Sequence, residues 1–172
     1  MKLISLLILP ILGFGQTKLE QNISLQNDKI QLLVPKSLTE MSDKMWKFKY
    51  HERPKPALVL SDENGEVNFI VEFTDDKATD SQVSDYKDYL VANMKKVRKD
   101  IEALDDGVKT INGKKVGYFR FLSQAIDQRV FNHLFFTVVD GKVVAFSVNC
   151  IAKLIPDWEK TAADIMESLK IK

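Results

Sequence analysis

Cysteine and histidine are scarce in this chain of 172 residues. Cys150 is the single cysteine, and His51 and His133 are the only two histidines. One cysteine excludes an internal disulfide framework and a multi-cysteine zinc site. No short ligand spacing joins the two histidines, so we expect no metal site. A Walker-type phosphate loop and a G-x-G-x-x-G turn are also missing from the sequence, and we expect no cofactor.

A clear excess of one charge sign is missing as well. The chain has 25 Lys and Arg against 24 Asp and Glu, which gives a net charge of +1. A strongly basic nucleic-acid binder is therefore disfavoured, and we expect no nucleic-acid partner. Hydrophobic residues make up 45% and charged residues 28%, which is typical of a globular protein. The length favours a single domain.

Only one long hydrophobic run is present, at the N-terminus. Lys2 precedes an apolar stretch over residues 3–12, and Gly13-Phe14-Gly15 follows it. A positive start, a short apolar run and a small-residue exit predict a secretory signal peptide over residues 1–15. The run is too short to span a membrane, and no other follows, so we expect no transmembrane segment after cleavage. The sequence thus predicts an exported protein, periplasmic or secreted.

The remainder divides into a short polar stretch and one domain. Residues 16–28 are rich in Gln and Asn and predict a polar tether, and residues 29–172 predict a single domain. Period-2 patterns and the turn pairs Asn64-Gly65, Asn112-Gly113 and Asp140-Gly141 predict antiparallel hairpins. Spacings of three and four predict two helices, over residues 81–99 and 156–169. The predicted strands cover residues 29–34, 45–51, 57–60, 67–73, 107–111, 115–123, 129–139 and 142–150.

The late strands carry apolar residues on both faces. Phe131 and Phe135 alternate with Val130, Leu134 and other apolar residues. A sheet covered on both sides explains this pattern, with the two helices as the covers. The expected fold class is α+β: an α/β/α sandwich around a mostly antiparallel sheet, with a long helix after the first hairpin and a C-terminal helix.

The order of these elements resembles the PsbP-like superfamily. The resemblance covers residues 29–172 and rests on the element order, the turns Ile111-Asn112-Gly113-Lys114 and Val139-Asp140-Gly141-Lys142, and a helix that begins near Trp158. The superfamily includes an extrinsic photosystem II subunit, a Ran-binding nuclear import factor and exported bacterial proteins of unknown role. The resemblance implies an α/β/α sandwich and a role in binding or assembling other proteins. No functional motif of the family is matched residue by residue.

Cys150, His133 and Asp127 supply the residue types of a nucleophilic triad. The turn at Asp140-Gly141 predicts that Cys150 pairs with Phe131 and that His133 lies diagonally across on the same face. No nucleophile-elbow signature accompanies them. We therefore expect Cys150 to be a buried structural residue, and the ring tip of His133 to be hydrogen-bonded or wet at the sheet surface.

A basic pattern provides the candidate binding site. In an extended strand, the basic residues at every second position of residues 47–55 would form a ladder on one side, opposite the aromatic side chains of Trp46, Phe48 and Tyr50. Such a ladder would suit an acidic protein face, a lipid headgroup or a polysaccharide. The alternative is an edge strand that Lys and Pro protect against aggregation. The five residues of the ladder are Lys47, Lys49, His51, Arg53 and Lys55.

These observations predict an exported, non-enzymatic binding or assembly module that acts on a protein or an anionic component of the cell envelope. Two alternatives come from other classes. A carrier of a small apolar or lipid-like ligand would hold a continuous apolar cavity between sheet and helix. A hydrolase with an unrecognised site would show a cleft with converging, perturbed titratable groups.

Overall fold

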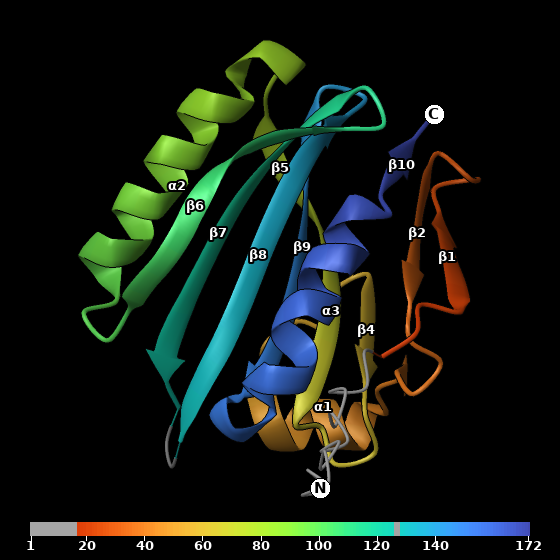
Figure 1. Ribbon diagram of the computed structural model, residues 1–172, viewed down its shortest axis with the longest axis vertical. Coiled ribbons are helices and arrows are strands. Elements are labelled where there is room, and N and C mark those ends of the chain that lie inside the picture. The colour runs from red at the N-terminus through yellow and green to blue at the C-terminus, as the bar shows by residue number, and fades with distance from the viewer. Residues whose placement is uncertain (1–16, 126–127) are drawn as a thin grey trace, which may run out of the picture.

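A seven-stranded antiparallel sheet forms the centre of the molecule. The computed structural model describes residues 17–125 and 128–172. Across the sheet the strands follow the order β3-β4-β5-β9-β8-β7-β6, so every sequential hairpin except the pair β5 and β6 lies side by side (Figure 1). The strands are β3 (Thr39–Glu40), β4 (Leu58–Ser61), β5 (Val67–Lys77), β6 (Glu102–Ile111), β7 (Lys114–Gln124), β8 (Arg129–Val139) and β9 (Lys142–Ile151).

One helix covers each face of this sheet, and the predicted α/β/α sandwich is confirmed. Helix α2 (Val83–Val97), preceded by the 3-10 turn η1 (Asp80–Gln82), packs on β6 and β7. Helix α3 (Ile155–Glu167), preceded by η2 (Ala152–Leu154), packs on β8 and β9 from the other side. Figure 1 shows the two helices on opposite sides of the strands.

The alternation along β8 sorts its side chains between the two covers. Phe131 and Phe135 belong to the large core beneath α3, whereas Phe136 and Val138 pack with Val83 of α2. Both sets are almost fully buried. A strand that is apolar on both faces is what a sheet covered on both sides requires, so this expectation is confirmed.

The late hairpins have the predicted turns and register. Asn112 and Asp140 have φ of 47° and 50°, and the glycine after each also has positive φ, as tight two-residue turns demand. The register pairs Val139 with Lys142 and Phe131 with Cys150, as the turn position predicts.

A small second sheet corrects the expectation of a polar tether over residues 16–28. Residues 21–25 form β1 (Gln21–Leu25), which pairs with β2 (Ile30–Val34), and β2 also pairs with β10 (Lys170–Ile171). Ile23 lies in the main core and Leu25 packs against it, because their alternation with polar residues gives the strand one apolar face. The turn at residues 26–28 uses three consecutive positive φ angles. Residues 1–15, the predicted signal peptide, lie outside the described residues.

The predicted strand at residues 45–51 is wrong. These residues belong to helix α1 (Asp43–Tyr50), which lies at one end of the long axis (Figure 1). Trp46, Met45 and Tyr50 pack with Met41 and Val59 in a small core of their own. Trp46 and Tyr50, four residues apart, stack with ring centroids 4.2 Å apart, a contact that helical spacing permits and a strand does not.

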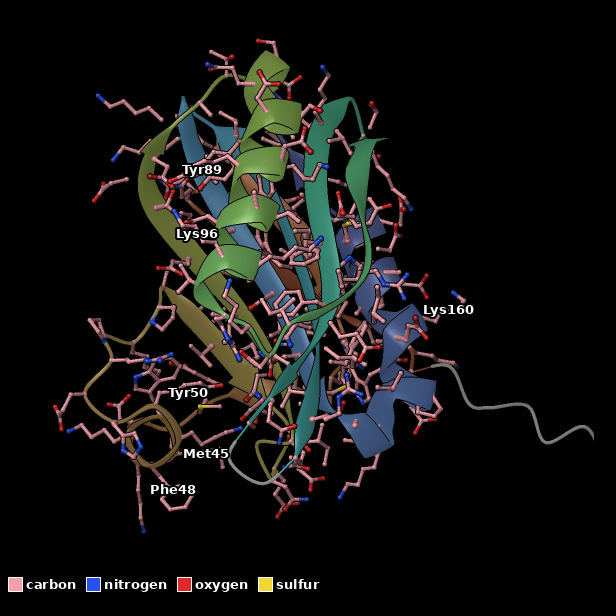
Figure 2. All side chains as sticks on the ribbon, turned by 90° about the vertical axis from the view of Figure 1, so that its left-hand side faces the viewer. Met45, Phe48, Tyr50, Tyr89, Lys96 and Lys160 are labelled. Carbon is pink, nitrogen blue, oxygen red and sulfur yellow. The ribbon has the colours of Figure 1, made fainter. Side chains whose placement is uncertain are left out.

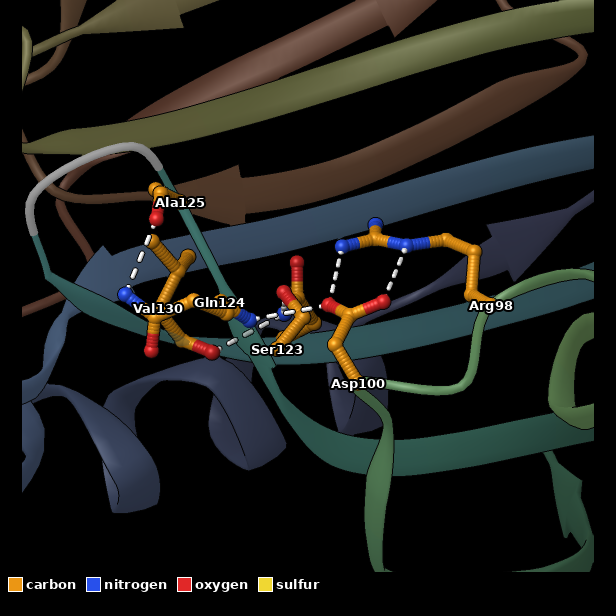
Figure 3. A network of polar contacts seen from close by, with 7 residues as sticks. Arg98, Asp100, Ser123, Gln124, Ala125 and Val130 are labelled. Carbon is orange, nitrogen blue, oxygen red and sulfur yellow. Dashed lines mark hydrogen bonds and ion pairs between the residues drawn. The ribbon is translucent and has the colours of Figure 1, made fainter.

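A polar network fixes the crossing from α2 to β6. Arg98 donates to Asp100 through Nε at 3.2 Å and Nη2 at 2.6 Å, and the backbone N–H of Gln124 donates to Asp100 at 2.9 Å (Figure 3). These hydrogen bonds lower the pKa of Asp100 to about 2. The end of β7 is thereby tied to the segment that enters β6.

A candidate basic site around the first helix

Helix α1 forms because Ser42 caps its N-terminus, although the alternation of aromatic and basic residues in this segment suggests a strand. The Ser42 hydroxyl accepts a hydrogen bond from the backbone N–H of Met45 at 3.2 Å, and Asp43 places an acidic side chain in the first turn. Both features stabilise a helix N-terminus. The helix ends at Tyr50, and the next residue, His51, has a φ of 56° that turns the chain away. The alternating aromatic residues of this segment are therefore wound onto a helix.

Winding the segment into a helix breaks the predicted ladder. Lys47 and Lys49 are two residues apart, so on a helix they point in different directions. Lys49 turns inward and donates to the backbone carbonyl of Gly65. Its partial burial lowers its pKa. The prediction that Lys49 shares a face with the other basic residues is therefore wrong.

The remaining four members of the ladder converge. They line a surface depression of about 260 Å³, together with Trp46 and the acidic side chains of Asp43 and Glu52. Lys47 lies on α1 and His51 caps its end, and the chain that follows the helix folds back along it. The four residues are Lys47, His51, Arg53 and Lys55. We call residues 43–55, which contain all of this lining, the basic corner.

A buried hydrogen bond holds the returning chain against the helix. Trp46 donates from Nε1 to the backbone carbonyl of Arg53 at 2.8 Å. Trp46 is only 6% exposed, so this bond is shielded from water and fixes the distance between helix and return segment. The depression is therefore held in shape by the core of α1.

Lys55 is largely committed to this architecture. Its ammonium donates to the Met41 carbonyl and to the Asp43 carboxylate, both at 2.8 Å. The hydrogen bond and the charge of Lys55 lower the pKa of Asp43. Lys47, His51 and Arg53 remain exposed at the rim, where they can reach an anionic partner.

Cys150 and His133 lie elsewhere, beneath α3. His133 pairs with Val148 and Cys150 with Phe131, as predicted, but His133 is only 1% exposed. Within the described residues neither ring nitrogen of His133 has a hydrogen-bond partner, so the expectation of a bonded or wet ring tip is wrong. Asp127, the third member of the candidate triad, lies outside the described residues.

Burial shifts the pKa of both groups away from the values that nucleophilic catalysis requires. The pKa of His133 is lowered to about 3 by burial and by the charges of Arg120 and Lys109. The pKa of the Cys150 thiol is raised to about 12 by burial and by the charge of Glu159. A nucleophilic cysteine needs a lowered pKa and a base within reach, and this pair has the opposite shift.

Residues 17–125 and 128–172 contain no helix with the length and apolar character needed to cross a membrane. In the same residues, no three His, Cys, Asp or Glu side chains gather in a group that could hold a metal ion.

Phe48 is a second residue of α1, after Lys49, whose predicted position is wrong. The period-2 pattern grouped it with Trp46 and Tyr50 on a single apolar face, but its side chain is 83% exposed. The signal that would have placed it correctly is Ser42 as a helix cap, because helical spacing puts Phe48 on the side of α1 opposite Trp46 and Tyr50.

Solved structures of other proteins share the fold of this chain. No protein-family model matches the chain, and no curated protein matches it. The solution structure of cyanobacterial PsbP (CyanoP) from Synechocystis sp. PCC 6803 is 15% identical, with a TM-score of 0.61, over 93% of this chain and 96% of that one. LpqN of Mycobacterium tuberculosis, described as involved in cell envelope biogenesis, is 13% identical, with a TM-score of 0.57, over 88% and 90%.

A protein of unknown function from Pseudomonas aeruginosa, described as a putative regulator, is also similar. It is 11% identical, with a TM-score of 0.52, over 92% of this chain and 99% of that one. The chain therefore has a PsbP-like fold, as the order of its elements suggested. At such low identities the similarity defines the fold alone.

Proposed function

We propose that this protein is an exported, non-enzymatic binding or assembly module whose partner is a protein or an envelope component with an anionic surface. The observation that carries the proposal is the convergence of Lys47, His51 and Arg53 on one depression of about 260 Å³. Export is supported by the predicted signal peptide over residues 1–15.

Charge distribution supports an anionic partner. The basic corner contains five Lys or Arg residues and two Asp or Glu residues, a net charge of +3. The whole chain carries +1, so all other residues together carry −2. A local positive field on an otherwise slightly negative molecule steers an anionic partner to this corner rather than to the whole surface.

The non-enzymatic part of the proposal is supported by the state of Cys150 and His133, the candidate nucleophile and base. The raised pKa of Cys150 and the lowered pKa of His133 leave the thiol protonated and the imidazole a weak base. Both groups are buried beneath α3, where Phe131 and Phe135 fill the surroundings. A hydrolase would need a cleft that brings substrate to these atoms.

The carrier alternative has less support. The space between α3 and the sheet is filled by side chains with almost no exposure, among them Phe146, Ile165 and Met166. The depression at α1 and a second one of about 220 Å³ beside the β8–β9 turn both lie outside this interface. A lipid-like ligand would therefore have to displace a packed core.

The proposal is tested by removing the two free cations at the rim. Lys47→Gln combined with Arg53→Gln should weaken capture of the partner from an envelope extract by about tenfold at low salt, because each near-surface charge contributes up to ~1 kcal/mol. The loss should shrink as salt screens the charges.

A matched variant separates position from net charge. Lys160→Gln combined with Lys170→Gln removes two positive charges from exposed sites elsewhere, and Lys160 lies far from α1 (Figure 2). This control should capture the partner as the wild type does. Equal capture by all three proteins at low salt would exclude the basic corner as the binding surface.

A further inference from the structure

Phe48 projects from the basic corner into solvent. It is 83% exposed, the highest value among the large hydrophobic side chains of the described residues. Met45 and Tyr50 of the same helix turn toward the body of the protein, and Figure 2 shows Phe48 directed away from it. The helix would be equally well packed with a polar residue at this position, so the exposed ring has no role in holding α1 in place.

Basic groups surround this ring. Lys44 precedes Phe48 by one helical turn and lies on its side of the helix, and Lys47 is its neighbour in the chain. Lys44, Lys47 and His51 are all exposed. Phe48 is therefore an apolar tip with a cationic rim, at the corner that carries the net charge of +3.

We propose that the basic corner docks on an anionic phospholipid surface, with the ring of Phe48 inserted at the boundary of headgroups and acyl chains. The inference rests on the proposed function and names its anionic partner. A basic face that also presents an aromatic residue is the pattern of segments that lie in a membrane interface. Lys and Arg close to an anionic leaflet add an attraction that falls off within a Debye length.

The shape of the corner favours a lipid surface over an acidic protein. Helix α1 lies at one end of the long axis (Figure 1), and Phe48 points away from the body of the protein there (Figure 2), so a flat membrane can reach the ring. Lipid accepts a protruding ring without a pre-formed pocket, whereas a protein partner needs a complementary cavity. Lys47 and Arg53, which line the depression of the same corner, are exposed and add attraction to anionic headgroups.

One aromatic ring and a few cations give weak, reversible binding, so the test uses vesicles at low salt. Wild-type protein should sediment with vesicles containing about one third phosphatidylglycerol and should stay in solution with pure phosphatidylcholine. Phe48→Ser should lower the partition onto anionic vesicles by about tenfold, since the apolar contribution is lost. Lys47→Gln combined with Arg53→Gln should lower it as well, and more so at low salt than at high salt.

A control variant and a spectroscopic reporter complete the test. Tyr89→Ser removes an aromatic ring that is 65% exposed on α2, away from the basic corner, and should bind vesicles as the wild type does (Figure 2). Phe48→Trp should retain binding, and its added emission should shift to the blue with anionic vesicles only. Phe48→Ser should fold normally, because the side chain is exposed.

The outcomes separate this inference from the proposed function. Wild-type protein that ignores anionic vesicles, or Phe48→Ser that binds them as tightly as wild type, overturns the membrane inference. If an acidic protein is then captured at low salt and lost with Lys47→Gln and Arg53→Gln, the proposed function stands with a protein partner. If neither vesicles nor any partner depend on these two residues, both proposals fall.

Discussion

His133 lies on β8 beneath α3 with 1% of its surface exposed. Burial, together with the nearby charges of Arg120 and Lys109, lowers its pKa to about 3. Arg120 is its partner across β7 and β8 and forms an ion pair with Glu159 of α3, so a second positive charge at His133 would face an existing one. The folded protein therefore resists protonation of this imidazole.

This resistance makes stability fall on acidification. The pKa of histidine is 6.5 in the unfolded chain and about 3 at His133 in the folded protein. Between these two pH values the unfolded state therefore binds the proton that the folded state does not, and acidification favours unfolding. At pH ~4.5 the loss from this group is about 2–3 kcal/mol. His133→Leu should remove this loss. From pH ~7.5 to ~4.5, the free energy of unfolding of the variant should therefore fall by about 2–3 kcal/mol less than that of the wild type. Urea unfolding at the two pH values measures this, and parallel pH dependence of the two proteins would contradict it.

Cys150 is fully buried, and its raised pKa of about 12 keeps the thiol protonated. It should therefore react slowly with thiol reagents until the protein unfolds. Cys150→Ala should destabilise the protein by about 1 kcal/mol and leave partner capture unchanged, because the residue acts only in packing. Mass spectrometry of thiol labelling, with and without urea, checks this. Fast labelling of folded protein, accompanied by lost capture, would restore the nucleophile hypothesis.

The positions of these two residues were predictable, but their environment was not. A two-residue turn at Asp140-Gly141 determines which residues face each other, so the pairing of Cys150 with Phe131 could be worked out from the sequence. Whether His133 is wet depends on how α3 lies across the sheet. That packing involves residues more than twenty positions away and leaves no local pattern.

Helix α1 shows where periodicity misleads at the scale of an element. Trp46, Phe48 and Tyr50 alternate as in a strand, and Pro54 follows as at a protected edge. The Ser42 cap and the stacking of Trp46 on Tyr50 favour the helix instead. Four of the five predicted binding residues still meet at one depression, because the chain reverses after His51 rather than because it is extended.

The elements after α2 were far easier to predict. Asn-Gly and Asp-Gly turns mark the hairpins of β6 with β7 and of β8 with β9, and the strand predicted over residues 129–139 has the observed bounds. The strand predicted from residue 107 begins earlier, at Glu102. Its first half carries mostly polar or charged residues at the sheet edge, so hydrophobicity does not reveal it.

The pairing of β7 with β8 requires a residue without a side chain at position 117, which is Gly117. Gly117 lies opposite Phe136, and a Cβ at Gly117 would come within 2.4 Å of that ring. The ring is held from the other side by Tyr86 of α2, at 5.0 Å between centroids. Gly117→Ala should therefore force Phe136 into α2 and destabilise the protein by about 1–3 kcal/mol.

Gly107→Ala is the matched control for this substitution. Its added Cβ would meet the hydroxyl end of Tyr118, at 2.9 Å, and that side chain is partly exposed and can move. Thermal unfolding should show a much smaller loss for Gly107→Ala than for Gly117→Ala. Equal losses would mean that the ring of Phe136 is free to shift.

Across the whole molecule, the two helices that cover the sheet pack on hydrophobic cores of different size. The α3 side holds the large core, which β2 and the small sheet extend. The α2 side holds two smaller clusters, around Val83 and around Phe119. Helix α1 packs on its own small core at the end of the molecule, so changes at its exposed face should leave both larger cores intact.

The small sheet joins the two ends of the described chain, since β2 lies between β1 and β10 and the backbone N–H of Lys172 donates to Lys29 at 2.9 Å. Ile30 and Leu32 of β2 also share the core with Ile165 and Leu169. Synthesis runs from the amino end, so β1 and β2 emerge early, and β2 can pair with β10 and pack on α3 only after the rest of the described chain has been made. If the chain is exported as proposed, it passes through the translocation pore before this closure can form. Folding then completes on the far side of the membrane, when the final helix arrives.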